Sequence, residues 1–129
     1  MINIETAYPL FVTNNLSDLK DYYSENFGFE AVFFEPNFYL HLLHSESGQQ
    51  LGFLMPDHPS QPAFLHSATS NIGSIITFEV PSAKDAWQIA KDTGLNIVLD
   101  YTEESWGQNH LLVRDPQGLM IDLVENVQQ

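Results

Sequence analysis

Residues 48–54, GQQLGFL, and residues 118–124, GLMIDLV, carry one pattern at two places in the 129-residue chain. Each stretch opens with a glycine, which suits a tight turn, and reaches a large apolar residue five positions later, Phe53 or Leu123. Within each stretch the large apolar residues recur at every second position, as on a β-strand with one buried face. Two such stretches indicate an internal repeat whose unit ends in a turn and a strand.

The sequence before each stretch predicts one strand, one helix and two further strands. A helix is expected over residues 16–27, where apolar residues recur at spacings of three and four, and Gly28 is placed to end it. In the second copy, Ser82 and Asp85 resemble a capping box and Gly94 ends the helix. The predicted strands are residues 7–12, 29–35, 38–44, 50–55, 74–80, 95–100, 110–114 and 119–124.

The repeat predicts the α+β class, with two tandem βαβββ modules that form a curved mixed sheet. One helix per module cannot cover both faces of a sheet, so the helices are expected outside and a ligand cleft on the inner face. Module one spans residues 1–55 and module two spans residues 74–129, joined by a Pro- and Ser-rich connector over residues 56–73. Together they make one domain of 129 residues.

Strand alternation assigns the faces of the two repeated stretches. Leu51 and Phe53 belong to the core, so Gly52 faces the cleft. A bulge would exchange the two faces of its strand. In the last strand the core positions are Leu119, Ile121 and Leu123, and the cleft-facing ones are Met120, Asp122 and Val124.

Charge and composition exclude several classes of function. With 17 acidic and 4 basic residues the chain carries a formal charge of −13, which disfavours nucleic acids and anionic membrane surfaces as partners. It has no cysteine, so disulfides, thiolate metal sites and cysteine nucleophiles are ruled out. No apolar run approaches a membrane span, and residues 1–5 lack signal-peptide features, so a cytoplasmic location is expected.

Three stretches, in this order and spacing, resemble the vicinal oxygen chelate superfamily of glyoxalase I, extradiol dioxygenases, fosfomycin-resistance enzymes and bleomycin-resistance proteins. Residues 15–29 contain NL, YY and FGF at the characteristic spacing, and residues 114–123 contain RDPQG followed by IDL. Residues 104–107, ESWG, are most similar to the bleomycin-resistance branch. The resemblance covers nearly the whole chain and implies the same two-module fold.

The resemblance implies four strand positions at which the enzymes of this superfamily hold a divalent metal. Here they carry Ala7, Gly52, Ile75 and Asp122, of which Asp122 alone has a side chain that can bind a metal. A register shift of one residue on the first strand of each module adds no His or Glu. We therefore expect no metal and no cofactor, and a binding protein rather than an enzyme.

Other residues offer weaker candidates for chemistry. His41 and His44 are three apart on a predicted strand and so lie on opposite faces, while His58 and His66 are expected to be solvated in the connector. His110 either lines the cleft or has an ordinary structural role. Neighbouring loop carboxylates such as Glu103 and Glu104 are usually exposed charges, and Trp87, at helical spacing with Ala83 and Ala90, is expected in the core.

Trp106 lies in a predicted loop, where it can stack on a flat or cationic ligand, plug one end of the sheet, or join a subunit contact. The leading hypothesis is a metal-free protein of the bleomycin-resistance type that sequesters a cationic or aromatic ligand at a homodimer interface, with strand exchange left open. The alternatives are a metal-dependent lyase, isomerase or dioxygenase with a divergent site around Asp122, His41 and His110, and a non-catalytic assembly module. The candidate ligand-binding residues are Phe38, His41, Gly52, Trp106, His110, Met120 and Asp122.

Overall fold

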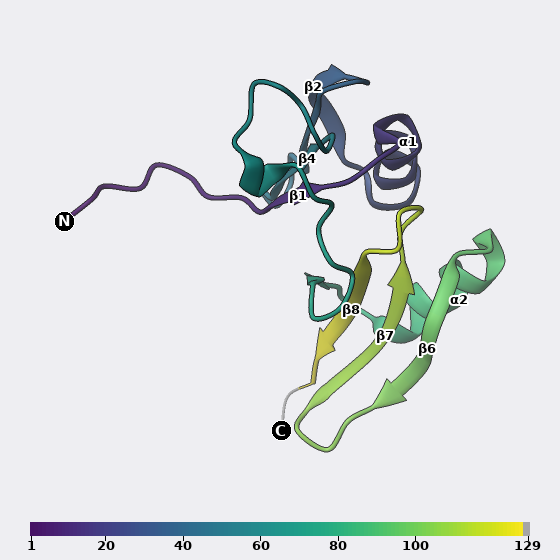
Figure 1. Ribbon diagram of the computed structural model, residues 1–129. Coiled ribbons are helices and arrows are strands. Elements are labelled where there is room, and N and C mark those ends of the chain that lie inside the picture. Colours follow the sequence, from purple (N-terminus) through teal and green to yellow (C-terminus); the bar gives the residue numbers. More distant parts are fainter. Residues whose placement is uncertain (128–129) are drawn as a thin grey trace. The chain divides into compact units, whose positions relative to one another are not determined.

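The computed structural model describes residues 1–127 and divides into two compact units, Met1–Thr69 and Ser70–Gln129 (Figure 1). Within the described residues, each unit contains one α-helix and one four-stranded mixed sheet, which confirms the α+β class and the tandem modules. None of the helices in residues 1–127 is long and apolar enough to cross a membrane.

The two sheets have the same strand order, which shows that the repeat in the sequence is a repeat in the structure. In each, the first strand pairs in parallel with the last, and the other neighbouring strands are antiparallel. The first unit has the order β1-β4-β3-β2 and comprises β1 (Leu10–Val12), α1 (Leu16–Phe27), β2 (Glu30–Glu35), β3 (Tyr39–Leu43), β4 (Gln50–Leu54) and a 3-10 helix, η1 (Ala63–Leu65). The second has the order β5-β8-β7-β6 and comprises β5 (Ile75–Glu79), α2 (Ala83–Thr93), β6 (Asn96–Glu103), β7 (Gln108–Arg114) and β8 (Met120–Asn126).

Both helices end as predicted but begin differently. Gly28 and Gly94 adopt the left-handed conformation, both with φ 74°, in which glycine avoids the strain of a Cβ atom. Ser82 caps α2 by accepting a hydrogen bond from the backbone N–H of Asp85. Asn15 instead has φ 55° and donates its side-chain amide to the Asp18 carboxylate at 2.6 Å, so no side chain caps α1.

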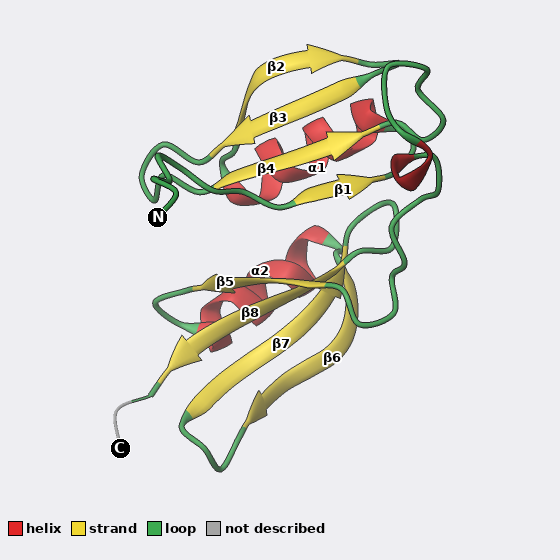
Figure 2. Cartoon of the chain, turned by 60° about the vertical axis from the view of Figure 1, so that its left-hand side comes forward, coloured by secondary structure: helices red, strands yellow, loops and turns green. Residues whose placement is uncertain are grey.

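Each helix packs against one face of its own sheet (Figure 2). In the first unit this buried face includes Leu51 and Phe53 of β4, and in the second it includes Ile121 and Leu123 of β8, as the alternation predicted. Val124 differs from the prediction, because it is 2% exposed although it belongs to the other face of β8. Its partners across the sheet are Glu79 of β5 and His110 of β7.

Two expectations about single elements were wrong. The strand predicted over residues 7–12 begins only at Leu10, so Ala7 lies before β1; Pro9 has no backbone N–H to donate to a ladder. Trp87 is half-buried and not in the core. The small side chains of Ala83 and Ala90 make the buried contacts of α2, and the Trp87 ring stacks on Tyr101 of β6.

The turn between β7 and β8 is built around a buried carboxylate. Asp115 is 5% exposed, and its Oδ1 accepts hydrogen bonds from the backbone N–H groups of Gln117 at 2.9 Å and Leu119 at 3.0 Å. Gly118 has φ 90°, a conformation that favours glycine. The RDPQG segment is therefore a structural turn that places β8, and with it Asp122, beside β7.

Candidate functional site

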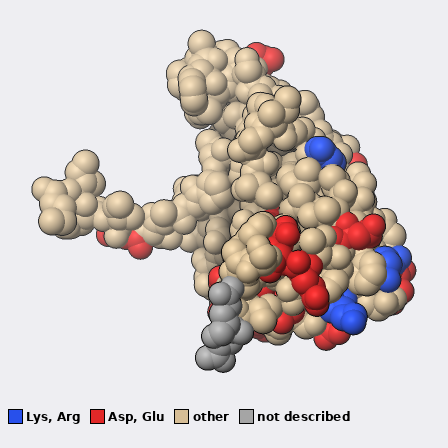
Figure 3. Space-filling model, turned by 90° about the horizontal axis from the view of Figure 1, so that it is seen from below, with Lys and Arg blue, Asp and Glu red and all other residues tan. Residues whose placement is uncertain are grey.

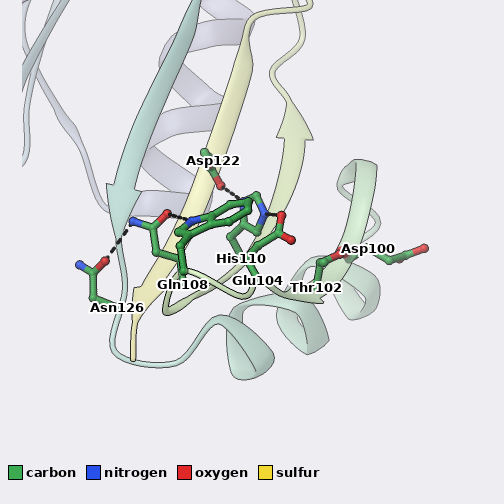
Figure 4. A network of polar contacts seen from close by, with 8 residues as sticks. Asp100, Thr102, Glu104, Gln108, His110, Asp122 and Asn126 are labelled. Atoms are coloured by element: carbon green, nitrogen blue, oxygen red, sulfur yellow. Dashed lines mark hydrogen bonds and ion pairs between the residues drawn. The ribbon is translucent and has the colours of Figure 1, made fainter. Parts of the chain in front are cut away.

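His110 on β7 is held between two carboxylates (Figure 4). Its Nδ1 lies 2.8 Å from Oδ1 of Asp122 on β8, and its Nε2 lies 2.9 Å from Oε2 of Glu104 in the β6–β7 turn. The three side chains are 12%, 19% and 25% exposed, respectively, so water screens these contacts only in part. A ring with both nitrogens bonded to carboxylates must donate from both, which is the hydrogen-bonding pattern of an imidazolium.

The irregular pairing of β6 with β7 brings Glu104 to this ring. The register shifts between Ile97 and Leu99 and again between Leu99 and Thr102, after which Thr102 pairs with His110. The Glu104 backbone N–H then donates to the Gln108 carbonyl at 2.8 Å and closes the turn. Sequence reasoning treated Glu104 as an exposed charge, because the bulges that turn it toward His110 leave no clear sequence signal.

The two carboxylates control the protonation of His110. Burial by itself lowers the pKa of the imidazole, but hydrogen bonds to Glu104 and Asp122 and the charges of these two groups outweigh it. The pKa of His110 is therefore raised above its ordinary value of 6.5. The cluster thus favours a cationic ring with one net negative charge over the three residues.

Trp106 stands at the tip of the same hairpin and is 62% exposed. Its indole N–H donates to Oε1 of Gln108 at 3.0 Å, and Gln108 donates to Asn126 at 3.1 Å (Figure 4). Asn126 in turn donates to Oε1 of Glu79 at 2.7 Å. This chain of hydrogen bonds fixes the orientation of the exposed indole relative to β5 and β8.

His41 organises a second polar group in the first unit. Its Nδ1 lies 2.7 Å from the Tyr39 hydroxyl and its Nε2 lies 2.6 Å from Oε1 of Gln50. Gln50 also donates its amide to Oγ1 of Thr6 at 3.2 Å, and the ring of Tyr8 meets the imidazole edge-on at 4.5 Å. Tyr39 and Gln50 were not among the predicted site residues, although both alternate with predicted ones, at positions two before His41 and two before Gly52.

The Tyr39 hydroxyl occupies the space above Gly52. A Cβ atom built on Gly52 would lie 2.5 Å from the Tyr39 hydroxyl oxygen and 3.1 Å from a methyl carbon of Leu10. Contacts as short as the first are essentially never made by real Cβ atoms. Any side chain at position 52 would therefore displace Tyr39.

Five of the predicted site residues form two groups, one within each unit. Trp106, His110 and Asp122 lie together in the second unit, while His41 and Gly52 lie together in the first. Phe38 contacts the ring of His58 at 4.3 Å, so this connector histidine is half-buried and not fully solvated. Met120 of β8 pairs across the sheet with Ile75 of β5 and Arg114 of β7.

The four positions that the family resemblance assigns to a metal do not fit one here. Ala7 and Ile75 have no donor atoms, Gly52 lies beneath the Tyr39 hydroxyl, and Oδ1 of Asp122 is bonded to His110. The Glu104 and Asp122 carboxylates lie on opposite nitrogens of the imidazole and pair with it instead of converging on one point. Across residues 1–127, no group of three or more His, Asp or Glu side chains is arranged to hold a metal ion.

Solved structures share this architecture at low sequence identity. A lactoylglutathione lyase from Agrobacterium tumefaciens has a TM-score of 0.75 at 16% identity, covering 95% of this chain and 94% of its own. A virulence protein from Salmonella typhimurium has a TM-score of 0.76 at 21% identity, covering 98% and 100%, and TioX from Micromonospora sp. ML1 has a TM-score of 0.68 at 16% identity, covering 95% and 100%. These similarities show the fold, and no curated protein sequence matches the chain.

The family itself is shown by the sequence. The sequence profile of the Glyoxalase/Bleomycin resistance protein/Dioxygenase superfamily matches residues 6–123, from before β1 to the middle of β8, and so covers both βαβββ modules except for the end of the last strand. The match agrees with the two tandem modules of equal strand order and with the resemblance seen in the turn and helix motifs. The chain therefore belongs to the Glyoxalase/Bleomycin resistance protein/Dioxygenase superfamily.

Proposed function

We propose that this chain is a metal-free binding protein of the bleomycin-resistance type, which sequesters a cationic aromatic small molecule. The observation that carries the proposal is the exposed indole of Trp106 next to the acidic Glu104–His110–Asp122 cluster. An indole face attracts flat rings by stacking and cations through its quadrupole. Because Gln108 holds the indole N–H, the ring is already oriented before a ligand arrives.

The charge of the chain supports a cationic ligand. Acidic residues outnumber basic ones by 17 to 4, and on the face that Figure 3 shows carboxylates are more numerous than Lys and Arg groups. A field of this sign raises the local concentration of cations and speeds their association. It disfavours anionic substrates, including those with phosphate or several carboxylate groups.

We expect that a planar cationic dye such as proflavine, and bleomycin itself, will quench the fluorescence of Trp106. The Trp87→Phe variant makes Trp106 the sole tryptophan and should keep the wild-type affinity. Trp106→Ala should weaken binding by about 2- to 30-fold, the range of cation–π and stacking contributions at partly exposed sites. Isothermal titration calorimetry measures this change, because it needs no tryptophan. Equal affinities in wild type and Trp106→Ala would contradict the proposal.

A metal titration of the same purified protein distinguishes the proposed binding function from that of a metal-dependent lyase, isomerase or dioxygenase. We expect Ni²⁺, Mn²⁺, Zn²⁺ and Fe²⁺ to leave the melting temperature unchanged, because Asp122 is bonded to His110 and the other three positions lack donors. A metal that bound only the folded state would raise the melting temperature. About one metal per chain after purification, together with a lower melting temperature in EDTA, would favour an enzyme.

A homodimer remains our prediction, and sedimentation velocity would test it.

A further inference from the structure

The hydrogen bonds around His41 determine which atom carries each proton. Gln50 donates its amide NH₂ to Thr6, so its Oε1 is the atom that faces Nε2 of His41. An amide oxygen only accepts, and Nε2 must therefore carry a proton. In the neutral ring Nδ1 is then a lone pair, and the Tyr39 hydroxyl donates its hydrogen to it at 2.7 Å.

A phenol whose hydrogen is committed in this way can offer a ligand only its oxygen lone pairs. Burial, followed by the nearby Tyr8, raises the pKa of Tyr39 above its ordinary value of 10.0, so the phenol stays protonated at neutral pH. The oxygen of Tyr39 is thus a neutral acceptor. Its natural partner is a donor, such as a protonated amine.

The hydroxyl oxygen of Tyr39 lies near other aromatic rings on one face of the first sheet. Leu40 and Leu42 are fully buried on the α1 side of β3, so Tyr39 and His41, which alternate with them, belong to the opposite face. Phe33 pairs with His41 across the strands, and its ring lies 6.1 Å from that of Tyr39. Phe33 is 50% exposed and Tyr8 is 46% exposed.

Gly52 holds the acceptor in place. Because even a methyl group there would meet the Tyr39 oxygen at 2.5 Å, glycine is the residue that allows the hydroxyl to lie against β4. The His41 bond then fixes its direction. The absence of a side chain at position 52 thus has a positive structural consequence, beyond the loss of a metal ligand.

We propose that the Tyr39 oxygen accepts a hydrogen bond from a protonated primary or secondary amine of a small-molecule cation bound to the first unit, and that the rings of Tyr8 and Phe33 flank this cation. The inference rests on the proposed function, from which it takes the cationic character of the ligand. It narrows the class of cation to ammonium groups that bear an N–H. Aromatic faces attract ammonium groups electrostatically, and the excess of 13 negative charges on the chain favours the same sign. A quaternary ammonium can use the rings but not the oxygen.

Two probes of equal charge test the inference, benzylamine and benzyltrimethylammonium. Titrations of the wild-type chain are followed by the NMR signals of the Tyr39 ring and the His41 imidazole. We expect benzylamine to bind at least about 5-fold more tightly, as one added hydrogen bond allows. Tyr39→Phe should remove this preference and retain binding of both probes through the rings. Gly52→Ala, which displaces the hydroxyl without deleting it, should do the same.

Tyr101→Phe is the matched control, because it removes a phenol hydroxyl that lies in the second unit and donates to Glu103. It should keep the preference for benzylamine. Equal binding of the two probes by wild type, or an unchanged preference in Tyr39→Phe, would overturn the inference. Failure of the proposed function is recognised separately, since it leaves Trp106 unresponsive to proflavine and bleomycin whatever the Tyr39 and His41 signals do.

Discussion

Replacing Asp115 with alanine is expected to lower the free energy of unfolding by about 2–4 kcal/mol. The substitution removes the acceptor of two backbone N–H groups, those of Gln117 and Leu119, in a turn where the carboxylate is buried. The Leu119 N–H is buried, and a buried donor left without a partner costs about 1–3 kcal/mol; the Gln117 N–H is only partly buried, so its loss adds about 1 kcal/mol. Urea denaturation of the purified variant measures the change through its midpoint.

Two further variants make this prediction specific. Gln117→Ala keeps the backbone N–H that Asp115 accepts and should change stability by less than about 0.5 kcal/mol. Asp115→Asn keeps an acceptor oxygen without the charge. Its loss in the free energy of unfolding should therefore lie between those of Asp115→Ala and Gln117→Ala. If Asp115→Ala unfolded at the wild-type urea concentration, the buried carboxylate would not be what stabilises this turn.

The stability of the chain is expected to fall as the pH rises through the pKa of His110. This pKa is raised in the folded state because Glu104 and Asp122 outweigh the effect of burial. The resulting stabilisation is therefore complete below the unfolded-state pKa of about 6.5 and is lost once the folded ring loses its proton. Above the pKa of His110 in the folded state, the ring is neutral and has one N–H to share between the two carboxylates.

Removing the two charges should abolish this dependence. In the double variant Glu104→Gln/Asp122→Asn, we expect the His110 pKa to move back toward 6.5 and the loss of stability with rising pH that wild type shows to disappear. His110→Ala should cost about 1–3 kcal/mol at pH 6, because two partly buried carboxylates lose a charged donor. NMR titration of the imidazole and urea denaturation from pH 6 to 9 check these points.

His44→Ala serves as the control for this titration. His44 lies just after β3, and the partner of its Nδ1, at 2.7 Å, is the neutral hydroxyl of Ser47. The His44→Ala variant should show the same change in the free energy of unfolding between pH 6 and pH 9 as wild type. A double variant that kept the wild-type slope would show that another group accounts for the pH dependence.

The fold was largely predictable from local pattern. Alternating apolar residues around Leu51 and Ile121, helical spacing before Gly28 and Gly94, and the repeated turn-strand stretch each indicate one element, because strand and helix periodicities bury different sets of positions. Comparing the two copies then predicted two equivalent modules. The structure corrected element boundaries, above all at β1, where the ladder begins after Pro9.

The candidate sites were predictable only in part, because residue type can be read along the chain but contacts across it cannot. The sequence by itself determined the acidic charge, the α+β repeat and the lack of donor side chains at Ala7, Gly52 and Ile75. Tertiary structure alone decided that Glu104 and Asp122 close on His110, and that Tyr39 lies over Gly52. Both arrangements depend on strand register and on bulges, which are set by the pairing of distant segments and not by the local sequence.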